Sequence, residues 1–391
     1  MGRGRSEGPA LDCYSRFIGV SLSTFDLVCG ISRAVALRLP AVAVAAALVL
    51  VAVSAQQPPP VTPPPAANAP ATNPPPALDP AVARLIQLGN RGVPVHAPSA
   101  ITKCKNEYWI FYTGRGVPSY HSEDLMTWRP GPRVFSNAPP WVAQTVPGNR
   151  SGMDFWAPDI LRFGGRYLLY YSVSTFGRNT SAVALATNPT LDPNDPQYHW
   201  TDQGIVVQST DRDDFNTIDP AACADAEGNL WLAFGSFWSG IKLIQLDPRT
   251  GKRIAPDSPM DSLARYSSIE ASFIYHHDGY YYLFVNWGMC CRGVNSTYNI
   301  RVGRSPKITG PYLDQDGKDL LTGGGTLFLE TDGAFIGPGQ TGIFAENGQE
   351  WFGCHFYNGT QRGASMYAIR PLRWAADGWP TVLEEKTPAA K

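Results

Sequence analysis

Hydrophobic and polar positions follow one pattern five times along the chain. Each segment has a short apolar run, a turn containing Gly, Asn or Asp, and a second run rich in aromatic residues. The segments begin at residues 97, 159, 219, 270 and 340, so their starts are 62, 60, 51 and 70 residues apart. Apolar β-formers on both sides of turn signals such as GG, EGN, HDG and ENG predict one β-hairpin in each segment. Gly and Pro interrupt nearly every stretch of the sequence, so the segments are not predicted to form helices.

Weaker strand-like runs, such as SAVALAT and YNIRVGR, follow the hairpins. A hairpin with one or two outer strands makes a propeller blade, and five such repeats predict an all-β fold, a five-bladed β-propeller. The first residue of each segment would then open the innermost strand of its blade. These residues, Ala97, Asp159, Asp219, Glu270 and Gln340, are expected to ring one mouth of the central channel. Three carboxylates would meet there in a small polar funnel.

Composition narrows the class of protein. The chain has 391 residues, 43% of them hydrophobic, which is enough for a sizeable core. Lys and Arg number 32 against 33 Asp and Glu, a net charge of -1, so no basic field exists for a nucleic-acid backbone. Only 17% of residues are charged, whereas 17 Phe, 17 Tyr and 11 Trp stand beside 38 Gly and 35 Pro. This mixture favours turn-rich β structure with surfaces for stacking.

The first 80 residues have a different character. An apolar run of 15 residues at 39–53 follows Arg33 and Arg38 and ends in small residues, which predicts a signal peptide cleaved after Ala55. The alternative, a membrane anchor, would need about 20 apolar residues. Residues 56–80 contain 11 Pro and predict an extended linker. The domain organisation is therefore an extension and signal peptide at 1–55, a linker at 56–80 and a propeller at 81–391. We expect a secreted or periplasmic protein with no membrane contact after cleavage.

Seven stretches carry a resemblance to a known family, in the order that the family has them. They are FWAPDI (155–160), VSTFGRNTSAVALATNPTLD (173–192), NTIDP (216–220), GSFWSGIKLIQLDPRTGK (235–252), SIEASFIY (268–275), STYNIRVGRSPKITGPY (296–312) and IGPGQTGI (336–343). On these motifs the chain resembles glycoside hydrolase family 43, in particular the arabinan endo-1,5-α-L-arabinosidases. The resemblance implies a five-bladed propeller that cleaves α-1,5-linked arabinan of pectin side chains with inversion.

The resemblance also implies roles for two carboxylates. Glu270 in SIEASF corresponds to the general acid, and Asp159 in FWAPDI to the carboxylate that orients the acid and adjusts its pKa. Such an acid must hold its proton near neutral pH, which burial and a nearby negative charge both favour. Sugar faces stack on aromatic rings and sugar hydroxyls need polar partners. The candidate substrate-binding residues are Phe155, Trp156, Asn216, Asp219, Ser236, Trp238 and Trp287.

One position departs from the family's pattern. The family's general base is an Asp in an HDPS-like motif, and this chain has Ala97 in His96-Ala97-Pro98-Ser99. Alanine cannot accept a proton, and a positioned base contributes ~10²–10⁴-fold to the rate, so we expect impaired catalysis. Three explanations stay open: a weakened relative that still binds arabinan, a substitution in an active enzyme, or another base such as Asp219 or Asp154. The alternative functions are a non-catalytic carbohydrate-binding propeller and an exo-acting family 43 arabinofuranosidase or β-xylosidase.

The remaining expectations concern ions, cysteines and partners. No cofactor is required, but many related enzymes have His in GPGH beside an axial ion, where this chain has Gln340. Its carbonyl oxygen suits a structural calcium or sodium ion, and a water-filled channel explains it equally well. Cys290 and Cys291 are candidates for a vicinal disulfide, and we expect buried free thiols at Cys104, Cys223 and Cys354. The expected partner is arabinan or an arabino-oligosaccharide, bound by a monomer.

Overall fold

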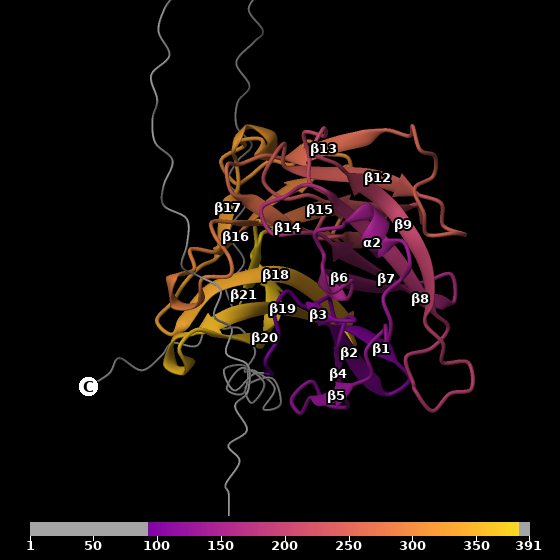
Figure 1. The fold of residues 1–391 in the computed structure, drawn as a ribbon. Coiled ribbons are helices and arrows are strands. Elements are labelled where there is room, and N and C mark those ends of the chain that lie inside the picture. Colours follow the sequence, from indigo (N-terminus) through magenta and orange to yellow (C-terminus); the bar gives the residue numbers. More distant parts are fainter. Residues whose placement is uncertain (1–92, 383–391) are drawn as a thin grey trace, which may run out of the picture. The chain divides into compact units, whose positions relative to one another are not determined.

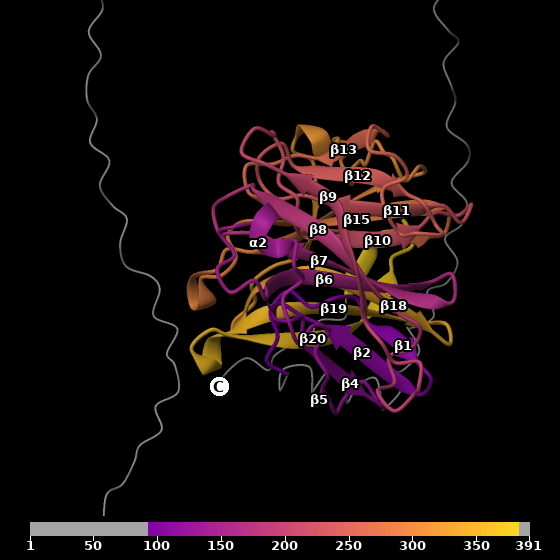
Figure 2. The ribbon, with the colours of Figure 1, turned by 45° about the vertical axis from the view of Figure 1, so that its right-hand side comes forward.

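Five antiparallel sheets radiate from a common axis in the computed structural model, which describes residues 93–382 (Figure 1). The fold is the five-bladed β-propeller that the repeats predict. A second view shows the sheets stacked side by side around the ring (Figure 2). The signal peptide and the Pro-rich linker that we predict lie outside the described residues. No helix within residues 93–382 is long and apolar enough to cross a membrane.

Each blade comes from one continuous stretch of chain, apart from one two-residue strand. Blade 1 contains β1 (Thr102–Cys104), β2 (Glu107–Phe111), β4 (Ser119–Ser122) and β5 (Arg129–Gly131). Blade 2 contains β6 (Asp154–Phe163), β7 (Arg166–Val173), β8 (Ser181–Asn188) and β9 (Thr201–Ser209), with β3 (Gly114–Arg115) added beside β6. The short helix α2 (Val142–Thr145) lies in the connection between these two blades. The innermost strands of blades 1 and 2 are β1 and β6, each of which pairs with the next strand of its own hairpin.

The other three blades have four strands each. Blade 3 contains β10 (Ala221–Ala224), β11 (Leu230–Phe234), β12 (Ile241–Leu246) and β13 (Met260–Ala264). Blade 4 contains β14 (Ile269–His277), β15 (Tyr280–Trp287), β16 (Asn299–Ser305) and β17 (Thr326–Leu329). Blade 5 contains β18 (Phe335–Glu346), β19 (Gln349–Asn358), β20 (Ala364–Trp374) and β21 (Pro380–Val382). Single-turn 3-10 helices occur in three loops, at η2 (Gly293–Asn295), η3 (Leu320–Thr322) and η4 (Gly359–Gln361).

The hydrophobic core is divided among the junctions between blades. Five clusters of buried side chains fill the spaces between blades 1 and 2, 2 and 3, 3 and 4, 4 and 5, and 5 and 1 within residues 93–382. Aromatic side chains such as Trp109, Tyr171 and Phe284 are fully buried in them. The high aromatic content therefore goes largely into packing one sheet on the next, where large rings bury the most apolar surface.

The ring closes where the start of the described chain meets the last blade. Tyr367 on β20 donates its backbone N–H to the Val93 carbonyl oxygen over 2.8 Å, and Pro94 pairs with Met366. The Ser365 hydroxyl donates to the Val95 carbonyl oxygen over 2.6 Å. These bonds hold the segment that leads into blade 1 against blade 5, so the first and last blades are fixed to each other.

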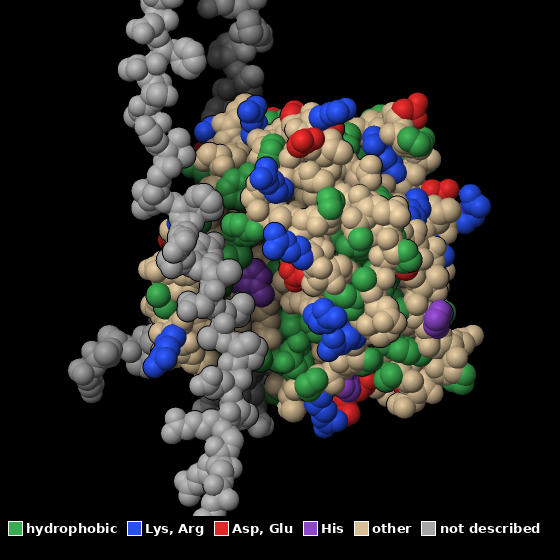
Figure 3. All heavy atoms as spheres, in the orientation of Figure 1, with side chains coloured by type: hydrophobic (Ala, Val, Ile, Leu, Met, Phe, Trp, Pro, Cys, Tyr) green, Lys and Arg blue, Asp and Glu red, His purple; other side chains and the backbone are tan. Residues whose placement is uncertain are grey.

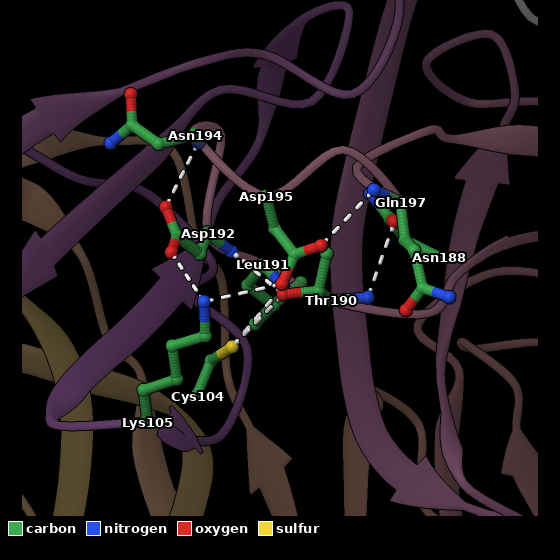
Figure 4. A network of polar contacts seen from close by, with 9 residues as sticks. All are labelled: Cys104, Lys105, Asn188, Thr190, Leu191, Asp192, Asn194, Asp195 and Gln197. Carbon is green, nitrogen blue, oxygen red and sulfur yellow. Dashed lines mark hydrogen bonds and ion pairs between the residues drawn. The ribbon is translucent and has the colours of Figure 1, made fainter.

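Blades 1 and 2 are also joined through a polar network (Figure 4). Lys105, in the turn after β1, donates to Asp192 over 2.6 Å and to Asp195 over 3.2 Å in the loop after β8. The Cys104 sulfur lies 3.5 Å from the Thr190 hydroxyl and accepts the Leu191 N–H over 3.3 Å. Cys104 and Cys354 are buried free thiols, as we expect, whereas the free thiol of Cys223 is only half-buried.

One residue near the start of each innermost strand has a positive φ angle. These angles are 45° at Ala97, 39° at Ala157, 57° at Asp219, 53° at Ala271 and 59° at Gln340. Each backbone N–H donates to a side chain of the preceding blade, and the acceptors are His355, Thr113, Ser172, Asp219 and Asn286 respectively. We call these five bonds the N–H ring. They mark equivalent positions in the five blades better than sequence spacing does.

The N–H ring corrects the register of the repeat at two blades. Ala97, Asp219 and Gln340 are equivalent, as the repeat predicts. The equivalent residues in blades 2 and 4 are Ala157 and Ala271, so Asp159 lies two positions further along its strand and Glu270 lies one position earlier. The three carboxylates are therefore attached at three different positions relative to the N–H ring, so sequence spacing does not identify which residues they contact.

Candidate active site

Glu270 lies at the start of β14 and is buried. Its Oε2 accepts a hydrogen bond over 3.0 Å from the hydroxyl of Ser236, which belongs to the loop between β11 and β12. Its Oε1 accepts from the hydroxyl of Tyr298, immediately before β16. Burial raises the pKa of Glu270 and outweighs these two bonds, which lower it. The carboxyl group is thus held in one orientation with its neutral form favoured.

Asp219 is the carboxylate that adjoins Glu270. Its Oδ2 accepts the backbone N–H of Ala271, the residue after Glu270, over 3.1 Å. Its own N–H donates to the Ser172 hydroxyl over 2.9 Å. Burial raises the pKa of Asp219 well above 3.8, and the negative charge of Glu270 raises it further. Because such an interaction is reciprocal, an ionised Asp219 also opposes ionisation of Glu270.

Asp159, the expected partner of Glu270, has a different place. Its Oδ1 accepts from the Ala100 N–H over 3.3 Å, and its Oδ2 accepts from the Ala222 N–H over 3.0 Å. The carboxylate therefore joins the innermost strands of blades 1, 2 and 3. Burial raises its pKa to about 6, and the two N–H bonds work against that rise. The shift of two residues along β6 explains the difference from the prediction: Asp159 meets neighbouring backbones, and Asp219 meets Glu270.

Ala97 occupies in blade 1 the position that Asp219 occupies in blade 3. Its N–H donates to Nδ1 of the buried His355 over 3.3 Å, and its methyl group is buried as well. No carboxylate leaves the backbone at this point. Asp154, one of the alternative bases, is exposed and accepts the indole N–H of Trp156 over 3.1 Å. It lies outside the N–H ring, whereas Asp219 is part of it.

The loop between β15 and β16 brings two cysteines to the same site. The Sγ atoms of Cys290 and Cys291 lie 2.6 Å apart without being bonded, so the two side chains are adjacent and the vicinal disulfide stays a prediction. The Cys291 N–H donates to the Tyr357 hydroxyl over 2.7 Å. The Cys291 sulfur lies 3.7 Å from Nε2 of His96, beside Ala97. The loop thus joins the Glu270 side of the site to the Ala97 side.

The predicted substrate contacts fall into two groups. Ser236 donates to Glu270, and Asp219 accepts the N–H of the residue after Glu270, so these two lie at the site. Trp238, which is 42% exposed, and the half-buried Trp156 stay predicted substrate contacts. Phe155 is fully buried, with its ring centroid 5.4 Å from that of Phe135 and 5.0 Å from that of Tyr171. Its ring therefore packs between strands and is not presented to a ligand.

The other two predicted contacts are also occupied within the protein. Asn216 is buried, and its Oδ1 accepts from the Ser181 hydroxyl over 2.8 Å. Trp287 is covered on one face by Tyr266, parallel to it at a centroid distance of 3.8 Å, and the Arg301 guanidinium lies 4.8 Å from its ring centroid. The ring that reaches solvent from this stack is Tyr266, which is 40% exposed.

Tyr298 and Tyr266 are the residues that the sequence analysis did not single out. Tyr298 lies within the STYNI stretch, but a tyrosine before a strand gives no sign of whether its hydroxyl or its ring is used. Tyr266 lies in RYSSIE, four residues before Glu270. An aromatic residue that close to a proposed catalytic carboxylate is a signal that could have been used.

Two hollows border Trp238 on the face where the innermost strands begin. One has a volume of about 410 Å³ and is formed with loop residues such as Thr175 and Arg178 after β7. The other has a volume of about 570 Å³ and lies toward blade 4, with Tyr266 and Lys318 in its wall. We call the second the blade 4 hollow. Both volumes are within the range of sites for small ligands.

Gln340 belongs to the N–H ring of blade 5. Its backbone N–H donates to Asn286 Oδ1 over 3.1 Å, and the hydroxyl of the next residue, Thr341, is buried without a hydrogen-bond partner. No group of three or more His, Cys, Asp or Glu within residues 93–382 is arranged to hold a metal ion. Any ion here would depend on neutral oxygen donors.

Comparison with known proteins identifies the class. The family model described as Glycosyl hydrolases family 43 matches residues 93–380, so the chain belongs to this family. It is a glycoside hydrolase of the arabinanase-like kind. It is 39% identical over 311 residues to the extracellular exo-α-(1→5)-L-arabinofuranosidase ArbA of Cellvibrio japonicus, covering 76% of this chain and 89% of the relative. It is 40% identical over 295 residues to the extracellular endo-α-(1→5)-L-arabinanase 1 of Bacillus subtilis, covering 73% and 87%.

The structural comparison agrees with the sequence comparison. The Cellvibrio cellulosa α-L-arabinanase, solved in complex with arabinohexaose, superposes with a TM-score of 0.71 at 39% identity. The match covers 74% of this chain and 96% of that one. The relatives thus include both exo- and endo-acting enzymes of arabinan, and the propeller is common to them.

Proposed function

We propose that this chain binds α-1,5-linked arabinan across the face where the innermost strands begin, with a site built for inverting, endo-acting hydrolysis. The observation that carries the proposal is the Glu270 carboxyl group, buried, held by Ser236 and Tyr298, and set beside Asp219. That combination keeps a carboxylic acid protonated toward neutral pH and pointed in one direction, which is what a general acid for a glycosidic oxygen requires.

In the proposed reaction Glu270 gives its proton to the glycosidic oxygen while the bond from that oxygen to the anomeric carbon breaks. A water molecule attacks the anomeric carbon from the opposite face, and its proton passes to a base there. Asp219 orients Glu270 through the Ala271 backbone. Because two adjacent negative charges oppose each other, this buried pair of carboxyl groups keeps a proton to higher pH than a lone carboxyl group would. We assign this supporting role to Asp219 in place of Asp159.

The base is the part that this chain lacks. Ala97 occupies the blade 1 position where the family carries an aspartate, and a methyl group takes no proton from water. We therefore propose slow hydrolysis with arabinan binding retained. A second function, a propeller that binds arabinan without cleaving it, is favoured by the same residue. The two differ in whether hydrolysis remains measurable above the uncatalysed rate.

Endo action is proposed from the hollows on either side of Trp238. The face is hollowed on both sides of Trp238, so neither side of the indole is closed by a wall. An exo-acting enzyme needs a wall at one end of its cleft. Because the relatives include an exo-acting enzyme, exo action is the competing proposal. Product patterns distinguish them, because endo cleavage of linear arabinan gives mixed oligosaccharides early and exo cleavage gives one short product.

The test uses the full chain with debranched linear arabinan and with arabinohexaose. Calorimetry measures binding, chromatography measures products over days, and proton NMR of fresh products reads the anomeric configuration. We expect micromolar to millimolar binding, very slow release of mixed oligosaccharides and inverted anomers. The control is Glu270→Gln, which should bind equally and release nothing. Absence of arabinan binding by the parent chain would overturn the proposal.

Two further expectations join the proposal. We infer export, supported by the extracellular relatives; sequencing the N-terminus of the mature protein from a culture medium tests cleavage after Ala55.

We also infer an axial calcium or sodium ion held by the Gln340 side chain and the Thr341 hydroxyl, since hard cations take neutral oxygen ligands. A rise in melting temperature with added calcium or sodium that Gln340→Leu removes would support the ion, and an equal rise in both proteins would contradict it.

A further inference from the structure

The blade 4 hollow carries features that the arabinan-binding role does not use. It is lined by two exposed aromatic rings, Trp238 and Tyr266, by the side chains of Arg265 and Lys318, and by the hydroxyl residues Ser267 and Thr322. In Figure 3, basic and hydrophobic side chains lie next to each other over the region of β13, β14 and β17. Arabinan is neutral, so it gives these two cations no partner.

The loop that carries Trp238 is held in a strained conformation. Phe237 and Trp238 have φ angles of 50° and 23°, which non-glycine residues adopt rarely and at an energetic cost. Three backbone bonds fix the loop: Phe237 N–H to the Ile269 carbonyl oxygen over 2.7 Å, Ser239 N–H to Asp214 over 2.9 Å, and Gly240 N–H to Phe237 over 2.7 Å. A large indole held outward at this cost points to a ligand that stacks on it.

Tyr266 is fixed on the opposite wall. Its ring lies parallel to Trp287 with an interplanar angle of 7°, and the Arg301 guanidinium also lies over the Trp287 ring, 4.8 Å from its centroid. The segment before Tyr266 is held by the Arg265 N–H, which donates to the Leu320 carbonyl oxygen over 2.9 Å. Tyr266 is therefore the outer ring of a fixed stack, and the hollow has two aromatic walls whose positions do not depend on a ligand.

The cations of the hollow are not neutralised by the protein. Neither Arg265 nor Lys318 forms an ion pair with a carboxylate of residues 93–382; Lys318 Nζ donates to the Gly323 carbonyl oxygen over 3.2 Å. The neighbouring Asp319 forms no ion pair with either cation, and its Oδ1 accepts the Leu321 N–H over 2.8 Å. Lys242 is close enough to Arg265 to be affected by its charge: burial and Arg265 lower the pKa of Lys242, and Asp214 acts in the opposite direction.

We propose that the blade 4 hollow is a glycan subsite for a sugar that carries a carboxylate, a uronate residue. Trp238 and Tyr266 stack on its ring, and Arg265 and Lys318 pair with its carboxylate. Aromatic faces with a nearby guanidinium are the elements that recognise a charged sugar, since the rings take its C–H face and the guanidinium takes its carboxylate in a bidentate pair. The volume of about 570 Å³ accommodates at least one sugar ring.

This inference rests on the proposed arabinan cleft for its biological sense. Tyr266 is four residues before Glu270, and Trp238 is two residues after Ser236, which contacts Glu270. A uronate in the hollow would thus lie beside an arabinan chain in the cleft. Pectin is a uronate polymer, so the hollow would favour arabinan still attached to its acidic backbone over free neutral chains.

The test measures binding of two probes by calorimetry to the full chain: a trimer of α-1,4-linked galacturonate and neutral arabinotriose. The variant is R265Q/K318Q, and the control is Arg249→Gln, an exposed arginine in the turn after β12. We expect the parent and the control to bind the galacturonate trimer, more weakly as salt rises from 50 to 500 mM. We expect R265Q/K318Q to bind it at least about tenfold more weakly, with arabinotriose binding unchanged.

The outcomes separate this inference from the proposed function. Equal galacturonate binding by the parent and R265Q/K318Q, or none by either, overturns the uronate subsite whatever arabinotriose does. Loss in Arg249→Gln of the same size as in R265Q/K318Q would also overturn it, because a general charge effect would then explain the binding. Galacturonate binding that needs Arg265 and Lys318, with no arabinotriose binding, would support the subsite and contradict the arabinan cleft.

Discussion

Restoring a carboxylate at position 97 is the most informative change that the structure suggests. Ala97→Asp places an aspartate at a position whose equivalent in blade 3 is already an aspartate, Asp219, with nearly the same φ and a proline next in sequence. An aspartate tolerates a positive φ better than alanine does, so the backbone does not oppose the change. By analogy with Asp219, its carboxylate can accept the N–H of Ala157, which now donates to the Thr113 hydroxyl over 2.9 Å.

The expected size of the effect follows from what a positioned base contributes. A gain of ~10²–10⁴-fold corresponds to about 2.7–5.5 kcal/mol of activation free energy. We expect Ala97→Asp to raise kcat/KM on debranched arabinan by at least about two orders of magnitude, while the dissociation constant for arabinohexaose stays within about threefold. The assay is reducing-sugar release under single-turnover and steady-state conditions, with binding measured separately by calorimetry.

The matched control for this experiment is Ala97→Asn. Asparagine has the same shape and the same tolerance of a positive φ, but its amide takes no proton from water. It should bind arabinohexaose as the parent does and hydrolyse no faster. The reasoning would be refuted by parent hydrolysis as fast as that of Ala97→Asp, because another group would then serve as the base. A gain in Ala97→Asn equal to that in Ala97→Asp would refute it too.

Three further predictions concern the carboxylates. In the Ala97→Asp background, Tyr298→Phe removes a hydrogen bond that lowers the pKa of Glu270, so the alkaline limb of the pH profile of kcat/KM should move to higher pH; an unmoved limb contradicts the assignment. In the same background, Asp219→Asn should move that limb to lower pH, whereas Asp159→Asn should leave its position unchanged, and the opposite pattern would return the supporting role to Asp159. The pKa of Asp159 in the folded protein is raised from 3.8 to about 6. Its protonated form therefore contributes on the order of 3 kcal/mol to stability below pH 3.8, and this contribution is lost as the pH rises to about 6. Urea unfolding of Asp159→Asn should show a flatter dependence of stability on pH, and an unchanged dependence would refute this.

The sequence predicts the architecture because its signal is repeated. Five hairpins with turn signals and aromatic second strands agree with one another, so an error in any one segment leaves the blade count unchanged. The same repetition misleads about register. A carboxylate at the start of a segment looks equivalent in all blades, but Asp159 and Glu270 sit at different levels from Asp219 because each strand enters the funnel with its own loop. The spacing of the repeats alone does not predict that Asp159 and Glu270 are shifted along their strands relative to Asp219.

Side-chain roles were predicted less evenly than the fold. Ser236 lies at the site because the loop between β11 and β12 carries it there, while Phe155 and Asn216 lie in equally suggestive motifs and are buried in packing. In a propeller, an aromatic ring can pack between two blades or lie exposed at the loops, and the sequence around it looks much the same in both cases. The choice depends on which side of a strand faces the next sheet. For Trp287 it depends on a ring, Tyr266, from another blade connection.

The N–H ring has a consequence for how the function is distributed along the chain. Each blade's entry into the funnel is positioned by a side chain of the blade before it, and blade 1 depends in this way on His355 of blade 5. The position of Glu270 therefore depends on more than its own blade: Asp219 of blade 3 accepts the N–H of the residue after Glu270, and Ser172 of blade 2 in turn accepts the N–H of Asp219. A cut or an insertion at an outer loop should be harmless while the ring of blades stays closed, and a loosened junction between blades 5 and 1 should weaken a site formed largely by blades 3 and 4.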